Sequence, residues 1–398
     1  MSTRIFAWIG ITIFFYYIFY SIFVGVINPI PTKGDSWDYH IPISKMILSG
    51  EIISPQHPII TQWYYPGSSE AINSFFLLLH IPLTLSNILA VIVLFLICWK
   101  LGGVFKLNYY ESIFFATTIV TLNGIVRWYN SVSIDVWLVN FFLLGIILLE
   151  RPKSSLKYFF ILGITLGMII GTKYTGFYYM AILTIFYGKR ILSLISVQKL
   201  LVFLVPFIIF GVSWYFRNYF FFHNPFYPLY FFGLPYTINF DMQVWNIFPH
   251  YPKDTLDAFF GEYKIWLLSI PLVIVQLLRG FIHTKKKTLK FFTDHKIEVI
   301  ILLLFIIFTL SPTDTKRWIM VSSIRYSYAS FILAILSVFL YSKKSKKIQW
   351  LFLISITSMI MVTSFNYYPK LVLLYGAGAL FCCYIFENYK KSLQKLFS

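Results

Sequence analysis

Charge is scarce in this sequence. Charged residues make up only 12% of the 398 positions, whereas hydrophobic residues make up 58%. A water-soluble domain needs more polar surface, so the composition excludes an ordinary soluble protein and predicts a polytopic membrane protein. Acids are the rarest charges, at 15 against 33 bases. The bases form short runs between apolar segments, as cytoplasmic loops do, and a nucleic-acid partner is not expected.

Cysteine and several catalytic motifs are also rare or missing. Cys98, Cys382 and Cys383 all lie in apolar segments, which excludes a disulfide framework and a cysteine-rich metal site. The sequence contains no Walker loop, no GxGxxG turn after a strand, no GxSxG elbow and no HExxH pair. Nucleotide-driven pumping and serine hydrolysis therefore lack their usual signatures.

Long apolar segments fill most of the chain. Because a helix needs roughly 20 residues to cross about 30 Å of hydrocarbon, we expect an all-α polytopic membrane protein with about twelve transmembrane helices, within a range of about 11 to 13. These helices would form one transmembrane domain over residues 1–398, with no water-soluble C-terminal domain. The expected spans begin near Ile5, Leu85, Tyr110, Ile134, Tyr158, Tyr174, Leu200, Ile265, Ile300, Tyr326, Trp350 and Leu371.

The loop charges predict an orientation in the membrane. With the N-terminus inside, about two thirds of the bases fall in cytoplasmic loops and most acids lie outside. This places both termini in the cytoplasm, and the lack of an ER-retention tail favours a bacterial-type plasma membrane. Two outer loops are long, at residues 28–82 and 217–264. The first contains SEAINSFFLLLH, a helix-like segment too short to span and expected at the membrane interface.

The first outer loop contains the leading candidate for a functional site, GDSWDYHIPISKMILSGEI at residues 34–52. If DSWDYH opens a helix, Asp35, Asp38 and Tyr39 share one face. The structural alternative for Asp35 is an N-cap. His40 follows directly, but no spacing joins the histidines into a metal site, so interfacial packing is its default role.

Further candidates lie at the outer ends of other expected spans. Asp135 begins the fourth span, where capping is again the alternative, although a carboxylate at this depth costs free energy unless it is solvated or paired. Lys173, Arg217 and Arg325 are each typical snorkelling anchors when taken singly. Together, facing an acidic loop, they predict a site for an anion such as a lipid phosphate.

These residues resemble the GT-C membrane glycosyltransferases, specifically the group of protein O-mannosyltransferases and lipid A aminoarabinose transferases. That group carries an Asp-Glu pair in the first outer loop, a Tyr four residues after the Asp, and a helix ending near Gly. The residues that fit are Asp35, Tyr39, Met46 and Gly50, followed by YPGSSEAI, SIDVWLVNFFLL, TKYTG, RNYFFFHNPFYPL and IRY. One departure is Ser36, which stands where the group has its second acid. The role of that acid passes to Asp38 or is absent. Another is the missing soluble C-terminal domain of many relatives.

The resemblance implies an outward-facing site and a polyprenyl-phosphate sugar as donor. We therefore expect an inverting transfer to a hydroxyl of a glycan, lipid or protein acceptor. Asp35 would be the general base, because an alcohol is a weak nucleophile until its proton is taken. The expected catalytic acids are Asp35, Asp135 and Asp38; the expected phosphate ligands are Arg325, Arg217 and Lys173; the expected cavity residues are Tyr39, His40, Tyr65, Asn218 and Tyr326. No protein cofactor is required, and a divalent metal is left open.

Three other functions are compatible with a multi-span protein of this kind. A transporter or flippase of lipid-linked glycans would show internal repeats or charges deep within its spans, whereas these charges gather at outer loops and span ends. A polysaccharide polymerase or ligase is expected to carry its large outer loop late in the chain. A non-catalytic membrane scaffold is the third alternative.

Overall fold

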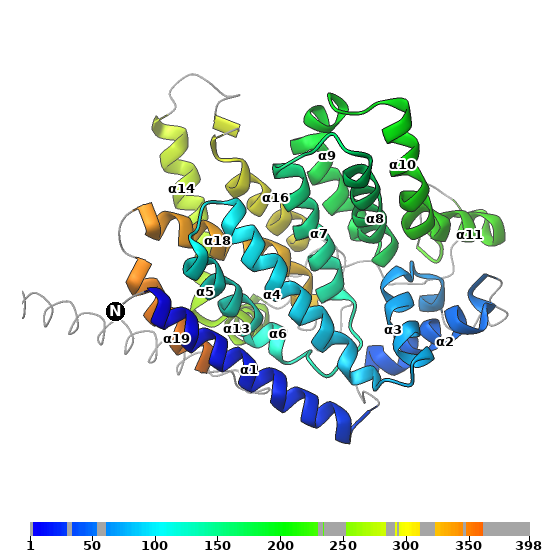
Figure 1. Ribbon diagram of the computed structural model, residues 1–398, viewed down its shortest axis with the longest axis horizontal. Helices are drawn as coiled ribbons and strands as arrows, with labels where there is room; N and C mark the ends of the chain where they lie inside the picture. Colours follow the sequence, from blue (N-terminus) through cyan, green and yellow to red (C-terminus); the bar gives the residue numbers. More distant parts are fainter. Residues whose placement is uncertain are drawn as a thin grey trace, which may run out of the picture. The chain divides into compact units, whose positions relative to one another are not determined.

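The computed structural model of the chain consists of helices joined by turns, and the part of the chain that it describes contains no strand (Figure 1). The all-α prediction is therefore confirmed. The expected last span near Leu371, together with Cys382 and Cys383, lies outside the described residues. The described residues are 3–29, 34–53, 61–229, 234, 252–283, 291–292, 294–310, 323–344 and 348–360.

Five segments are long and apolar enough to cross a membrane. They coincide with the expected spans that begin near Ile5, Leu85, Leu200, Ile265 and Tyr326. The segments are Thr3–Ile27, Leu83–Val104, Val197–Phe222, Thr255–Ile282 and Ile324–Lys344. The helices on the other described spans are shorter, at 12 to 17 residues. Together these helices give a polytopic membrane protein.

The chain divides into two compact units, each built from separate stretches of sequence. Unit 1 comprises Met1–Tyr17, Phe105–Arg127 and Val244–Ser398. Unit 2 comprises Ile18–Val104 and Trp128–Gln243. Most of the predicted site residues belong to unit 2, whereas Arg325 and Tyr326 belong to unit 1.

Unit 2 is organised around α8, which packs against α7, α9 and α10. Gly163 and Gly167 of α8 allow the backbone of α10 to approach closely, since a Cβ at either position would meet the main chain near Phe203 or Phe207. The helices of this unit are α2 (Ile41–Ser49), α3 (Ser68–Leu78), α4 (Ser86–Val104), α7 (Asp135–Glu150), α8 (Leu156–Thr172), α9 (Gly176–Leu192), α10 (Val197–Phe207) and α11 (Ser213–Phe222). The unit also contains the C-terminal part of α1 (Thr3–Ile27), from Ile18 onward.

Unit 1 is organised around α18 (Tyr328–Lys344), which packs against α5, α14, α16 and α19. Its apolar side chains are almost all buried, including Phe331, Ile335 and Phe339. A helix that is apolar all round and buried belongs to the core, so α18 is a core helix and not a lipid-facing one. The other helices are α5 (Tyr109–Val120), α6 (Asn123–Val126), α13 (Pro252–Tyr263), α14 (Ser269–His283), α16 (Lys296–Leu310) and α19 (Ile348–Ile360).

Candidate functional site

The stretch DSWDYH forms a π-helical segment, Ser36–His40, that continues directly into α2. Pro42 lies in the first turn of α2 and has no N–H, so it cannot donate to the carbonyl of Asp38 as an ordinary helical residue would. The indole Nε1 of Trp63 donates to that carbonyl instead, at 3.2 Å. Proline thus explains both the irregular helix and the attachment of residue 63 to it.

The π-helical turn changes the predicted arrangement of the first two acids. A shared face for Asp35, Asp38 and Tyr39 assumed α-helical spacing, whereas Ser36–His40 is a π-helical turn, with hydrogen bonds between residues i and i+5. Asp35 is half-buried, whereas Asp38 is exposed. The two carboxylates, which spacing alone could not distinguish, therefore lie in different surroundings.

Neither Asp35 nor Asp135 caps a helix with its side chain. The π-helical segment starts at Asp35 without a side-chain cap, and α7 starts after Ile134, also without one. Elsewhere in the chain, Asn108 and Ser155 do cap helices, by accepting from the backbone N–H of the third residue onward. The structure therefore shows no side-chain capping by Asp35 or Asp135, and the capping alternative is wrong for both.

Asp135 and Lys173, predicted for different roles, form an ion pair in unit 2. The Lys173 Nζ donates to Asp135 Oδ1 at 3.0 Å, and the Ser133 hydroxyl donates to Asp135 Oδ2 at 2.9 Å. Asp135 is only 4% exposed. A buried carboxylate is costly unless it is paired and hydrogen-bonded, and here it is both. The pair is electrically neutral, so the charge of Lys173 is already matched within the protein.

Arg217, on α11, has a different environment. Its Nη2 donates to the Tyr64 carbonyl at 2.7 Å and to Asn218 Oδ1 at 2.8 Å, and its guanidinium lies 5.1 Å from the centre of the Trp214 ring. The Nη1 nitrogen is buried without a hydrogen-bond partner among the described residues. No carboxylate of the described residues forms a salt bridge with Arg217. Such a cation is suited to receive an anion.

Asn218 connects the first outer loop to the turns that contain Tyr174 and Tyr227 by hydrogen bonds. Its Nδ2 donates to the carbonyls of Tyr64 and Tyr227, each at 3.0 Å, and lies 3.2 Å from the hydroxyl of Tyr174. That hydroxyl donates to the Tyr227 carbonyl at 2.6 Å. Burial raises the pKa of Tyr64 and of Tyr174, so both phenols are neutral at ordinary pH.

A row of aromatic rings connects these groups to the acidic loop. Tyr39 lies edge-on to Tyr65, with ring centres 6.2 Å apart, and Tyr65 lies edge-on to Tyr174, at 5.6 Å. Tyr174 directly follows Lys173, and Tyr39 lies beside Asp38 in the π-helical segment. Unit 2 thus brings together Tyr39, Tyr65, Lys173 and Asn218, which are far apart in the sequence.

His40 pairs with an acid that sequence reasoning did not select. Its Nδ1 lies 2.8 Å from Glu70 Oε1, and both residues are 1% exposed. Ser44 and Ser74 strengthen the junction between α2 and α3: Ser44 Oγ donates to the carbonyl of His40, and Ser74 Oγ to that of Ser44. Glu70 lies within SEAINSFFLLLH, a segment predicted as a helix. The sequence signal for its role was an acid on a mostly apolar helix.

The remaining predicted residues, Arg325 and Tyr326, lie in unit 1. Arg325 is 5% exposed and its guanidinium lies 5.6 Å from the centre of the Tyr326 ring. The same unit contains an ion pair between Arg127 and the fully buried Glu262. Gly124 leaves space for that carboxylate, because a Cβ there would meet it. Neither Arg127 nor Glu262 is among the candidates that the sequence pointed to.

No family model and no curated protein sequence matches this chain. Its structure is similar to the crystal structure of ArnT from Cupriavidus metallidurans in the apo state, with a TM-score of 0.54 and 12% sequence identity. The match covers 91% of this chain and 68% of that one. The chain therefore has the fold of ArnT, an all-α polytopic GT-C fold.

Among the described residues, no three His, Cys, Asp or Glu side chains are grouped to hold a metal ion.

Proposed function

We propose that this chain is a membrane glycosyltransferase that takes its sugar from a polyprenyl-phosphate donor. The proposal rests first on the fold, since ArnT is a lipid A aminoarabinose transferase of the GT-C group. The observation that carries it is the state of Arg217, a half-buried guanidinium with one free nitrogen and no carboxylate partner among the described residues. A departing lipid phosphate supplies the missing anion.

In this mechanism, Asp35 is the general base. The acceptor hydroxyl loses its proton to the Asp35 carboxylate while its oxygen bonds to the anomeric carbon of the sugar. The bond from that carbon to the phosphate oxygen breaks at the same time, and the phosphate leaves with the bonding electrons. Attack opposite to the leaving group inverts the anomeric centre. The half-buried position of Asp35 favours it over the exposed Asp38 as the base.

The positive groups have separate roles in this proposal. Arg217 contacts the phosphate through Nη1, as a fixed cation that stabilises developing charge. Lys173 holds Asp135 in place through their ion pair, so the two act as a positioning pair. Arg325 and Tyr326 lie in unit 1, and their roles as a phosphate ligand and a cavity residue stay predictions from the sequence. Tyr39, Tyr65 and Asn218 line the path between donor and acceptor.

The proposed site lies on the outer face of a bacterial-type plasma membrane, with both termini in the cytoplasm. The ends of α7, α8 and α11 that carry Asp135, Lys173 and Arg217 are the ends that the charge distribution places outside. The acceptor is a hydroxyl of a glycan, lipid or protein. A divalent metal is not required by the steps above.

The direct test is sugar transfer by the purified protein from a panel of polyprenyl-phosphate sugars, followed by mass spectrometry of the acceptors. Asp35→Asn keeps the shape and removes the base, so we expect transfer to fall by about a hundredfold or more. The matched control is Asp38→Asn, which alters an exposed acid three residues away and should stay within a few-fold of the parent. Equal activity of Asp35→Asn and the parent would refute the assignment of the base. Transport of an intact lipid-linked glycan without transfer would favour a flippase.

A further inference from the structure

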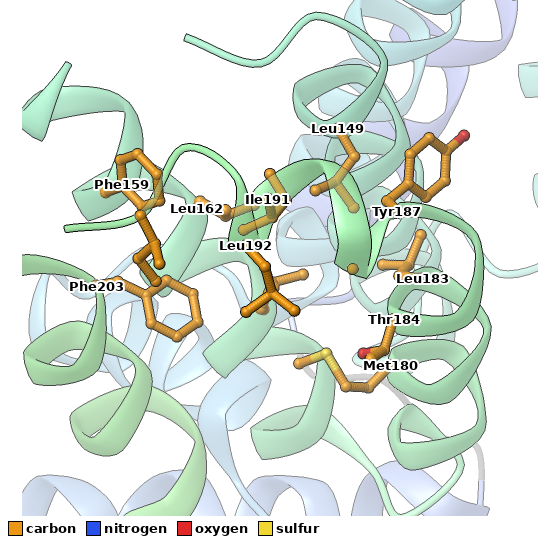
Figure 2. Close-up of a pocket in the computed structure, with 13 residues that line it drawn as sticks. Leu149, Phe159, Leu162, Met180, Leu183, Thr184, Tyr187, Ile191, Leu192 and Phe203 are labelled. Carbon is orange, nitrogen blue, oxygen red and sulfur yellow. The ribbon is translucent and has the colours of Figure 1, made fainter. Parts of the chain in front are cut away.

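An apolar cavity lies in unit 2, at the ends of α7, α8 and α9 that are remote from the candidate site. Its volume is about 200 Å³. Figure 2 shows Leu149, Phe159, Leu162, Leu183 and Phe203 around it, contributed by four different helices. These helices pack together along much of their length (Figure 1), so the cavity is a feature of a packed bundle.

The cavity is separate from the proposed sugar-transfer site. The helix α7 starts at Asp135 and has 16 residues, and Leu149 is its second-last residue. Helix geometry therefore places Leu149, the lining residue on α7, roughly 20 Å from Asp135. Along α9, which begins just after Lys173, the lining runs from Met180 to Leu192, so its nearest residue lies roughly 10 Å from Lys173 along the chain of helical residues.

The lining offers almost nothing to a polar ligand. Tyr187 contributes its ring, while its hydroxyl points away from the cavity and donates to Glu150 Oε1 at 2.7 Å (Figure 2). Thr184 is exposed and is the other lining residue with a hydroxyl. Sites for polar small molecules carry a few placed polar groups that fix orientation, and this lining has no such set. A hydrocarbon chain matches it better.

The rim of the cavity is basic. Lys199 lies one turn before Phe203 on α10, and its Nζ is 5.7 Å from the centre of the Phe159 ring. This Nζ donates to Ser154 Oγ at 2.7 Å and to the Leu194 carbonyl at 2.9 Å, and no carboxylate of the described residues forms a salt bridge with it. Lys189 is exposed and directly follows Gly188, a lining residue of α9. Glu150 is the acid at this end, and its carboxylate already accepts from Tyr187. The bases at this end are Arg151, Lys153, Lys157, Lys189, Arg190 and Lys199.

We propose that this cavity binds the acyl chain of an anionic bilayer phospholipid, with the phosphate held at the rim by Lys189 and Lys199. The apolar lining matches the chain, and the surplus of bases matches the negative headgroup. Neither feature depends on sugar transfer, so the proposal is independent of the proposed function. It concerns the membrane surface at the C-terminal ends of α7 and α9.

The test uses the full-length protein in nanodiscs and phospholipid probes with a photoreactive diazirine in the acyl chain. One probe is phosphatidylglycerol, which is anionic, and the other is phosphatidylcholine, which is zwitterionic. After irradiation, mass spectrometry locates the labelled residues. We expect the anionic probe to label the cavity-lining parts of α9 and α10 about five- to tenfold more than the zwitterionic probe. Equal labelling by the two probes would overturn the proposal.

Gly188 offers a matched pair of variants. A Cβ at this position would meet only the Thr184 methyl carbon, at 3.6 Å, so Gly188→Ala fits without strain and leaves the cavity open. Gly188→Phe fills it with a ring and should reduce cavity labelling to the level found on the lipid-facing side of α1. Labelling that persists in Gly188→Phe contradicts binding inside the cavity.

The rim provides a second, independent arm. Replacing Lys189 and Lys199 by Gln leaves the lining intact, so it tests the headgroup even if Gly188→Phe fails to fold. We expect this double variant to lose the preference for the anionic probe; an unchanged preference overturns the role of the rim. A photoreactive polyprenyl phosphate is the third probe. Stronger cavity labelling by that probe than by phosphatidylglycerol overturns the choice of a bilayer phospholipid.

Discussion

The two ends of α7, α8 and α9 in unit 2 are built from the same apolar helices and yet differ in how they treat polar groups. At one end, Asp135 is buried against Lys173 and Ser133. At the other, the bases lie at the surface around an apolar cavity, and Lys189 is exposed. Buried charge needs partners, whereas charge at a membrane surface is solvated and needs none.

This difference indicates at which end of the helices the side chains are more strictly constrained. The first end buries charges, at a cost that only pairing or a bound anion offsets, so its residues are constrained in identity and geometry. The second end requires only a shape lined by hydrocarbon and a surplus of positive charge. Substitutions should therefore have steep effects at the first end and graded ones at the second.

The largest expected effect is at Arg217. Arg217→Ala removes the proposed phosphate contact, and we expect transfer to fall by about a hundred- to a thousandfold, as when one preorganised charge-stabilising donor is lost. Arg217→Lys is the matched control, because it keeps the charge but not the planar contact with Asn218 and Tyr64; it should recover part of the activity. Transfer rates at several donor concentrations measure the effect. A full-rate Arg217→Ala enzyme would remove the distinction between the two ends.

The second effect concerns the pair between Asp135 and Lys173. Lys173→Met leaves a buried carboxylate without its cation, which should lower the stability of the fold by about 3–5 kcal/mol. Combining it with Asp135→Asn removes the stranded charge and should restore most of that loss. Thermal unfolding of the three variants in detergent measures the coupling. If the two single losses simply add in the double variant, the two side chains do not act as a pair.

Sugar transfer by that double variant gives a second result. A positioning pair predicts that restored stability brings back part of the transfer activity. If the double variant is as stable as the parent but inactive, Asp135 or Lys173 acts directly on the substrate. Lys173 would then again be a candidate phosphate ligand, as its position in the sequence TKYTG suggested.

A smaller effect is expected at the junction of α2 and α3. Glu70→Ala removes the acceptor for the Nδ1 of the buried His40 and should lower stability by about 1–3 kcal/mol. Glu70→Gln keeps an acceptor oxygen and should cost less. The two variants compared by thermal unfolding separate the hydrogen bond from the charge. An equal loss in both would mean that the charge of Glu70, and not its hydrogen bond, holds the junction.

Much of the fold could be predicted from the sequence, because long apolar segments have few alternatives to membrane helices. The same reasoning located Asp135, Lys173 and Arg217 at the ends of helices. It could not pair Asp135 with Lys173, since contacts between helices depend on packing that one sequence does not display. Pro42 was a readable signal for irregular backbone after DSWDYH, and the α-helical spacing assumed for Asp35 and Asp38 overlooked it.

The smallest expected effect lies at the cavity end, where Tyr187 donates to Glu150. Tyr187→Phe keeps the ring that lines the cavity and removes one hydrogen bond to a carboxylate, which should cost about 1–3 kcal/mol because hydrogen bonds to charged groups are the stronger ones. Other donors or water at the membrane surface can replace the lost hydrogen bond to Glu150, so the cost should lie towards the lower limit. Sugar transfer should be unchanged, because the site lies roughly 20 Å away along α7. A tenfold loss of transfer in a stable Tyr187→Phe protein would show that the two ends are coupled, and α7, α8 and α9 would then have to be treated as one functional unit.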